Sequence, residues 1–148
     1  TYVLARRGAR LTLLNRSLPA AEEIAEHIED DLHLEVRVRA LHDDWLEEAL
    51  KDADILINTT SLGMSPAIDA SPVPSGLLRE QIIVCDIVYN PTVTKLLADA
   101  RAAGARTIGG VDMLAWQGAL AFELWTGEEA PFELMRDMVL RVLDGHED

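Results

Sequence analysis

The run from Ile82 to Val88 constrains the fold more than any other stretch of this sequence. Apart from Asp86, its residues are apolar and mostly β-branched, which is typical of a strand buried on both faces of a parallel sheet. Asn90-Pro91 then interrupts the pattern as a turn. Because open α/β sheets bind ligands outside the carboxyl ends of their strands, Asp86, Tyr89 and Asn90 are candidates to touch a ligand. Alternatively, Asp86 and Asn90 cap the turn and Tyr89 packs against the protein.

Strand patterns alternate with helix patterns along the rest of the chain, which predicts a parallel sheet with right-handed crossovers. Strands are expected at residues 10–15, 35–41, 54–58, 82–88 and 106–108, the third of them buried. Helices are expected at residues 1–7, 19–32, 44–51, 94–103, 112–125 and 132–143. Asp44 and Glu47 resemble a capping box, and Gly8 and Gly104 are expected to end helices.

The helical period also predicts which side chains face inward. They are Ala21, Ile24, Ala25, Ile28 and Leu32, then Val93, Leu96, Leu97 and Ala100, then Phe132, Met135, Val139 and Val142. The fold class that follows is α/β, a doubly wound and mostly parallel sheet of the Rossmann-like kind. We expect residues 1–148 to be a single domain that begins mid-pattern, within a helix, and lacks its first strand.

Charge and cysteine content narrow the possible partners. The net charge of −13 argues against nucleic acid and against an anionic membrane surface, and no apolar run has the length that spans a bilayer. Cys85 is the only cysteine, which fits a reducing cytoplasm. No metal site is expected, because the four histidines do not have metal-ligand spacing: His27, His33, His42 and His146.

Asn15-Arg16-Ser17 follows the strand at residues 10–15. In a dinucleotide fold this position reaches the adenosine ribose, where an acidic residue binds NAD and an arginine accommodates the 2′-phosphate of NADP. Arg16 can pair with a phosphate through charge-assisted hydrogen bonds. It is equally well explained as a solvated arginine beside a helix that Ser17 caps.

Hydroxyl side chains follow the strand at residues 54–58, in the segment Asn58-Thr59-Thr60-Ser61-Leu62-Gly63-Met64. They can bind a ribose or a diphosphate, and Gly63 lets a ligand approach the backbone. Threonine, serine and glycine are also ordinary turn residues, so both interpretations stay open.

The expected helix at residues 112–125 carries a polar exception on an apolar face. Gln117 shares that face with Met113, Leu120, Ala121 and Leu124. A buried amide needs a partner, which is either neighbouring backbone or a substrate hydroxyl. On these residues alone, the chain is a nucleotide-binding α/β domain with no identifiable catalytic group.

Four motifs in this order resemble the shikimate dehydrogenase family. They are Asn15-Arg16-Ser17, the segment from Asn58 to Met64, Asp86-Ile87-Val88-Tyr89-Asn90-Pro91, and Gly110-Val111-Asp112-Met113-Leu114 with Gln117. The segment from Phe122 to Gly127 also resembles the closing helix of that family. The similarity covers nearly the whole chain, and the ordered set is highly specific.

The family reduces 3-dehydroshikimate to shikimate with NADPH, in a cleft between a substrate domain and a Rossmann domain. The resemblance implies that this chain is the second domain without its glycine-rich loop, and that its partner is the small-molecule substrate, shikimate or 3-dehydroshikimate. It assigns the adenosine 2′-phosphate to Asn15, Arg16 and Ser17. It assigns the cofactor path to Thr59, Thr60, Ser61, Ile87, Gly110 and Met113, and the substrate to Tyr89 and Gln117.

Two departures from the family pattern matter. Ala20 stands where the family often has a second basic residue, which leaves more of the 2′-phosphate to Arg16. The catalytic lysine–aspartate pair of the family lies on the substrate domain, so we expect this chain to be inactive alone. An NAD-dependent quinate/shikimate dehydrogenase and a non-catalytic nucleotide-binding module remain as alternatives.

Overall fold

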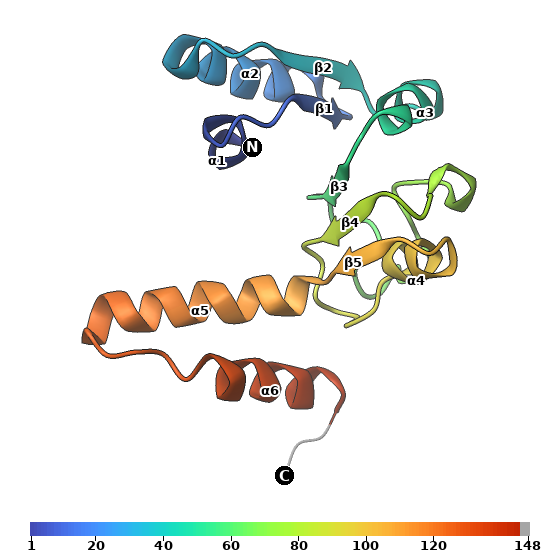
Figure 1. Cartoon of the computed structure of the whole chain (residues 1–148). Coiled ribbons are helices and arrows are strands. Elements are labelled where there is room, and N and C mark those ends of the chain that lie inside the picture. The colour runs from blue at the N-terminus through green and yellow to red at the C-terminus, as the bar shows by residue number, and fades with distance from the viewer. Residues whose placement is uncertain (146–148) are drawn as a thin grey trace. The chain divides into compact units, whose positions relative to one another are not determined.

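A computed structural model describes residues 1–145 of the chain (Figure 1). Strands alternate with helices and every strand pair is parallel, which confirms the predicted α/β class. The chain divides into two compact units, Thr1–Asp52 and Ala53–Asp148. Within the described residues, every helix is too short or too polar to cross a membrane.

The first unit is a βαβ arrangement with a helix at each end. Its elements are α1 (Tyr2–Arg6), β1 (Leu11–Asn15), α2 (Leu18–Leu32), β2 (Val36–Ala40) and α3 (Asp43–Lys51). β1 pairs with β2 from Leu11↔Val36 to Asn15↔Ala40, and α2 packs against both strands. Burial alternates along β2, since its apolar residues are half-buried and its two arginines are exposed.

The second unit contains a three-stranded sheet in the order β3-β4-β5. Its elements are β3 (Ile55–Asn58), a 3-10 turn (Ser75–Leu77), β4 (Ile83–Asp86), α4 (Lys95–Ala102), β5 (Arg106–Ile108), α5 (Gly110–Thr126) and α6 (Phe132–Leu143). β4 is the central strand, and Val84 in β4 and Leu97 in α4 have no exposed surface. β3 and β4 end in register, with Asn58 opposite Asp86.

Helices α5 and α6 run side by side in Figure 1. The rings of Trp116 and Phe132 stack with centroids 4.2 Å apart. Arg136 Nε donates to Asp112 Oδ1 over 2.6 Å near the start of α5. The two helices are therefore joined by an aromatic contact and an ion pair.

Several predicted details are wrong. The N-cap of α3 is His42, whose Nδ1 accepts from the Asp44 N–H at 3.5 Å, so Asp44 lies inside the helix. α5 begins at Gly110 rather than Asp112. β3 is not buried, because it is an edge strand of its sheet, and Ile55 and Ile57 are exposed.

Three side chains that were expected to face inward are exposed: Ile24, Val93 and Val142. Ile24 and Val142 lie at the margins of their helical stripes. Val93 precedes the N-cap of α4, so the helical period does not apply to it.

Candidate functional site

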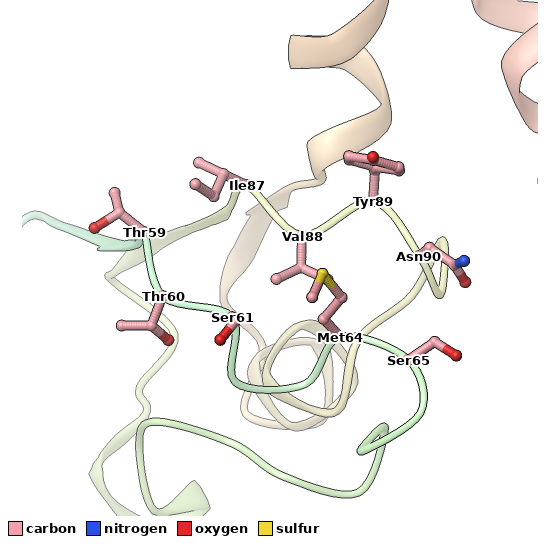
Figure 2. Close-up of a pocket in the computed structure, with 9 residues that line it drawn as sticks. All are labelled: Thr59, Thr60, Ser61, Met64, Ser65, Ile87, Val88, Tyr89 and Asn90. Atoms are coloured by element: carbon pink, nitrogen blue, oxygen red, sulfur yellow. The ribbon is translucent and has the colours of Figure 1, made fainter.

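A pocket of ≈ 410 Å³ opens at the carboxyl ends of β3 and β4 (Figure 2). It falls in the usual size range of small-molecule sites, about 300–1,000 Å³. Two chain segments enclose it, and we call residues 59–65 and 87–90 the rim segments. The lining residues are Thr59, Thr60, Ser61, Met64, Ser65, Ile87, Val88, Tyr89 and Asn90.

Asn58 lies at the base of the first rim segment and is 4% exposed. Its Oδ1 accepts from the Thr60 N–H at 3.0 Å and from Thr60 Oγ1 at 2.7 Å. Its Nδ2 donates to the Leu62 carbonyl at 3.3 Å and to Asp86 Oδ1 at 3.0 Å. The amide therefore shapes the turn after β3 and links it to β4.

Asp86 lies at the base of the second rim segment and is 2% exposed. Besides Asn58, its Oδ1 accepts from the Val88 N–H at 3.0 Å, and its Oδ2 accepts from Thr94 Oγ1 at 2.7 Å. All of these partners belong to the protein. For Asp86 the structural alternative is therefore correct, because its carboxylate holds the turn.

The remaining polar groups of the rim are accessible. Thr59, Ser61, Tyr89 and Asn90 are exposed, and Tyr89 keeps 42% of its surface. Within residues 1–145, the hydroxyls of Thr59 and Ser61 have no hydrogen-bond partner, whereas the Thr60 hydroxyl bonds Asn58. The pocket thus brings together five of the predicted site residues: Thr59, Thr60, Ser61, Ile87 and Tyr89.

Asn15, Arg16 and Ser17 belong to the first unit, between β1 and α2. Asn15 holds the turn, since its Oδ1 accepts from the Arg16 N–H at 3.0 Å and its Nδ2 donates to the Ser17 carbonyl at 3.1 Å. Ser17 is the N-cap of α2, but its side chain makes no capping bond. Arg16 is exposed, and no carboxylate of the described residues pairs with it.

Gly110, Met113 and Gln117 lie on α5, outside the pocket lining. Gly110 is buried, and a Cβ there would lie 2.5 Å from the Ile87 carbonyl oxygen. Gln117 is exposed, so the argument from a buried amide is wrong. The reason is that α5 buries another face, through Val111, Ala115 and Ala119, and leaves Met113, Leu120 and Leu124 exposed.

Two kinds of reactive side chain remain to be considered: a nucleophilic cysteine and a cluster of metal ligands. Burial raises the pKa of the Cys85 thiol above its usual range, so it is a poorer nucleophile than a free cysteine. No cluster of three or more histidine, cysteine or acidic side chains could hold a metal ion within residues 1–145. His146 lies outside the described residues.

Sequence reasoning missed the buried network of Asn58, Asp86 and Thr94. Thr94 is wholly buried, and its Oγ1 both donates to Asp86 and accepts from the Leu97 N–H. A usable signal was present, because Asn58 and Asp86 are polar residues near the ends of two predicted buried strands. Such residues need partners, and neighbouring parallel strands bring them together.

Most of the known proteins that we find similar to this chain are named shikimate dehydrogenases. Residues 110–140 match the family described as Shikimate 5'-dehydrogenase C-terminal domain. The chain is 46% identical over 145 residues to the shikimate dehydrogenase (NADP(+)) of Methanopyrus kandleri, covering 97% of this chain and 50% of the relative. The resemblance to the shikimate dehydrogenase family is confirmed.

Solved structures of similar proteins agree with this resemblance. One is the Thermus thermophilus shikimate 5-dehydrogenase in complex with NADP(H) and shikimate, with 35% identity and a TM-score of 0.79, covering 95% of this chain and 49% of that one. Another is the Corynebacterium glutamicum quinate dehydrogenase in complex with NAD, with 30% identity and a TM-score of 0.84, covering 94% and 49%. The chain therefore spans about half the length of the shikimate dehydrogenases that it matches.

Proposed function

We propose that this chain is the dinucleotide-binding part of an NADP(H)-dependent shikimate dehydrogenase, which reversibly reduces 3-dehydroshikimate to shikimate. One observation carries the proposal: a pocket lined by hydroxyls lies at the carboxyl ends of two adjacent parallel strands. Dinucleotide folds bind their ligand at that edge of the sheet. The similarity to shikimate dehydrogenases over nearly the whole chain supports the choice of reaction.

In the first unit, we assign the adenosine 2′-phosphate to Asn15, Arg16 and Ser17. No carboxylate within residues 1–145 pairs with the guanidinium of Arg16, and the first turn of α2 contains no acidic residue. A helix N-terminus and a free arginine both favour an anion. In a chain of net charge −13, this local positive charge is what a phosphorylated cofactor requires.

In the second unit, we assign the cofactor path to Thr59, Thr60, Ser61 and Ile87, and the nicotinamide ring to Gly110 and Met113. Tyr89 and Gln117 are assigned to the substrate, since both are exposed and can donate hydrogen bonds. The bound nicotinamide would supply the hydride. These residues position and orient ligands, and none of them is assigned the proton transfer.

Hydride transfer to a ketone also needs a positioned proton donor. Because the chain spans half the length of its relatives, we propose that a substrate domain outside these 148 residues supplies that donor. The isolated chain is then expected to bind nucleotide without turning over shikimate. A cytoplasmic location fits the lone, half-buried cysteine.

Nucleotide binding by the 148-residue chain tests the proposal. Arg16→Ala should weaken NADP⁺ binding by roughly ten- to a hundredfold, the effect of losing hydrogen bonds to a charged group, and should leave NAD⁺ binding nearly unchanged. Arg10→Ala is the matched control, because it removes the same charge at the amino end of β1. Equal losses in both variants, or an unchanged NADP⁺ preference in Arg16→Ala, would contradict the assignment.

An NAD-dependent quinate/shikimate dehydrogenase is the second candidate. Two observations favour it: the similarity to a quinate dehydrogenase in complex with NAD, and Ala20 in place of a second basic residue. This candidate predicts that the unaltered chain binds NAD⁺ at least as tightly as NADP⁺. The same titrations of the two nucleotides therefore decide between the candidates.

A further inference from the structure

The two rim segments are tied to each other at both ends. At their bases, Asn58 Nδ2 donates to Asp86 Oδ1 over 3.0 Å. At their far ends, the Ser65 N–H donates to the Asn90 carbonyl over 2.9 Å. The pocket lies between these two ties, so its width depends on both (Figure 2).

Thr94 links the hydrogen bond between Asn58 and Asp86 to helix α4. Thr94 Oγ1 donates to Asp86 Oδ2 over 2.7 Å and accepts from the Leu97 N–H over 3.3 Å, so the hydroxyl joins the carboxylate to the first turn of the helix. Thr94 also lies near the first rim segment, since a Cβ added at Gly63 would be 3.6 Å from the Cβ of Thr94. Thr94 itself does not line the pocket.

The proton positions in this network are determined by its partners. Asn58 Oδ1 accepts twice from Thr60, which turns the Asn58 NH₂ group toward Asp86. Thr60 Oγ1 donates its only proton to Asn58 and accepts from the Leu62 N–H at 3.1 Å. The hydroxyl of Thr60 therefore has no proton left for a ligand, whereas the hydroxyls of Thr59 and Ser61 are free to donate.

We propose that Asp86 is a positioning residue which, with Asn58 and Thr94, holds both rim segments in place. We further propose that Asn58, by occupying the Thr60 hydroxyl, leaves Thr59 and Ser61 as the hydroxyl donors to the ligand. The first part concerns the fold of the pocket and stands whatever the pocket binds. The second part rests on the proposed function, because it concerns the nucleotide.

Amide hydrogen exchange of the 148-residue chain tests the first part. Thr94→Val keeps the shape of the side chain and removes the hydroxyl, while Thr94→Ser keeps the hydroxyl. Thr94→Val should speed exchange roughly tenfold or more in residues 59–65 and 87–90, because Asp86 loses a hydrogen bond, and Thr94→Ser should restore slow exchange. Acceleration confined to the start of α4 would overturn the proposal.

A purely structural loss of stability would speed exchange everywhere. Val84→Ala provides that comparison, since Val84 is fully buried in β4 and its side chain has no polar group that could join the network. It should raise exchange across the second unit without a preference for the rim segments.

Thr60→Val breaks the other end of the network at a half-buried site. It should speed amide exchange in residues 87–90 as well as in its own segment, residues 59–65.

Titration with NADP⁺ tests the second part. Ser61→Ala and Thr59→Val should each weaken binding several-fold, because each removes a donor. Unchanged binding in both Ser61→Ala and Thr59→Val, measured on chains that still bind NADP⁺, would overturn this part. If no chain binds nucleotide, the proposed function fails, while the exchange data still decide the role of Asp86.

Discussion

Asp86 and Tyr89 are three residues apart, but only Asp86 lies within the sheet. Their side chains therefore have different roles. Asp86 is still within β4, where its neighbours bury it to 2% exposure and surround its carboxylate with donors. Tyr89 is past the strand end and stays 42% exposed at the pocket. The sequence placed both residues correctly at this edge. It could not assign their roles, because a residue's partners come from β3 and α4, which are distant in the chain.

The pKa of His27 is raised by groups on the surface of its own helix, α2. Its Nδ1 lies 2.7 Å from the Glu23 carbonyl oxygen, which favours the protonated ring and raises its pKa, and the charges of Glu23, Asp31 and Asp30 add to this. A raised pKa in the folded state means that His27 stabilises the fold below its unfolded pKa of about 6.5. That contribution is lost as the pH rises through the folded pKa.

We therefore predict that the ring protons of His27 titrate in the folded chain with a midpoint above the value measured in urea. An NMR titration from pH 5 to about pH 9 measures both midpoints. His27→Gln should remove this part of the pH dependence of stability. A folded midpoint at or below that of the unfolded chain would contradict the role given to the Glu23 carbonyl.

Among the elements, α5 shows what a helical period can and cannot predict. The period correctly placed Met113, Gln117, Leu120 and Leu124 on one face. It did not reveal which face would be buried, since α5 packs instead through small residues such as Ala115 and Ala119. Leu124 is 82% exposed as a result. The strand ranges were predicted within about two residues because β-branched runs and turn residues are local signals.

The start of α5 depends on a close approach that only glycine permits. A Cβ at Gly110 would lie 2.5 Å from the Ile87 carbonyl oxygen and 2.6 Å from that of Val88, both in backbone that cannot easily move. Gly110→Ala should therefore lower the free energy of unfolding by about 1–3 kcal/mol, the usual cost of overpacking. Urea denaturation measures it.

Gly76→Ala is the control for this change, because a Cβ there meets no atom within 4 Å. It should leave the stability within about 0.5 kcal/mol of the unaltered chain, as surface substitutions usually do. Equal stability of the two variants would mean that the backbone at Ile87 and Val88 moves to make room for the new methyl group. Since Gly110 is also assigned to the nicotinamide ring, nucleotide binding should be measured at a urea concentration where both variants are folded.

For the molecule as a whole, local patterns predicted the elements but not their division into two units. Parallel pairing joins β1 to β2. Separately, it joins β4 to β3 on one side and to β5 on the other. The first unit buries few apolar residues: Ala5, Ala21, Ile28, Leu46 and Leu50. The second unit buries a larger set, centred on Val84, Leu96 and Leu97. Strand partners are long-range contacts, so a single sequence does not specify them.

This division predicts that unfolding is not a single transition. Trp45 lies in the first unit, while Trp116 and Trp125 lie in the second. In a Trp116→Phe/Trp125→Phe chain, fluorescence reports Trp45 beside Arg39, whose guanidinium lies 5.0 Å from its ring centroid. In a Trp45→Phe/Trp125→Phe chain, it reports Trp116 stacked on Phe132.

Because less apolar surface is buried in the first unit, the Trp45 signal should change at a lower urea concentration than the Trp116 signal. Coincident midpoints, with circular dichroism of both double variants matching the unaltered chain, would show that the two units unfold together.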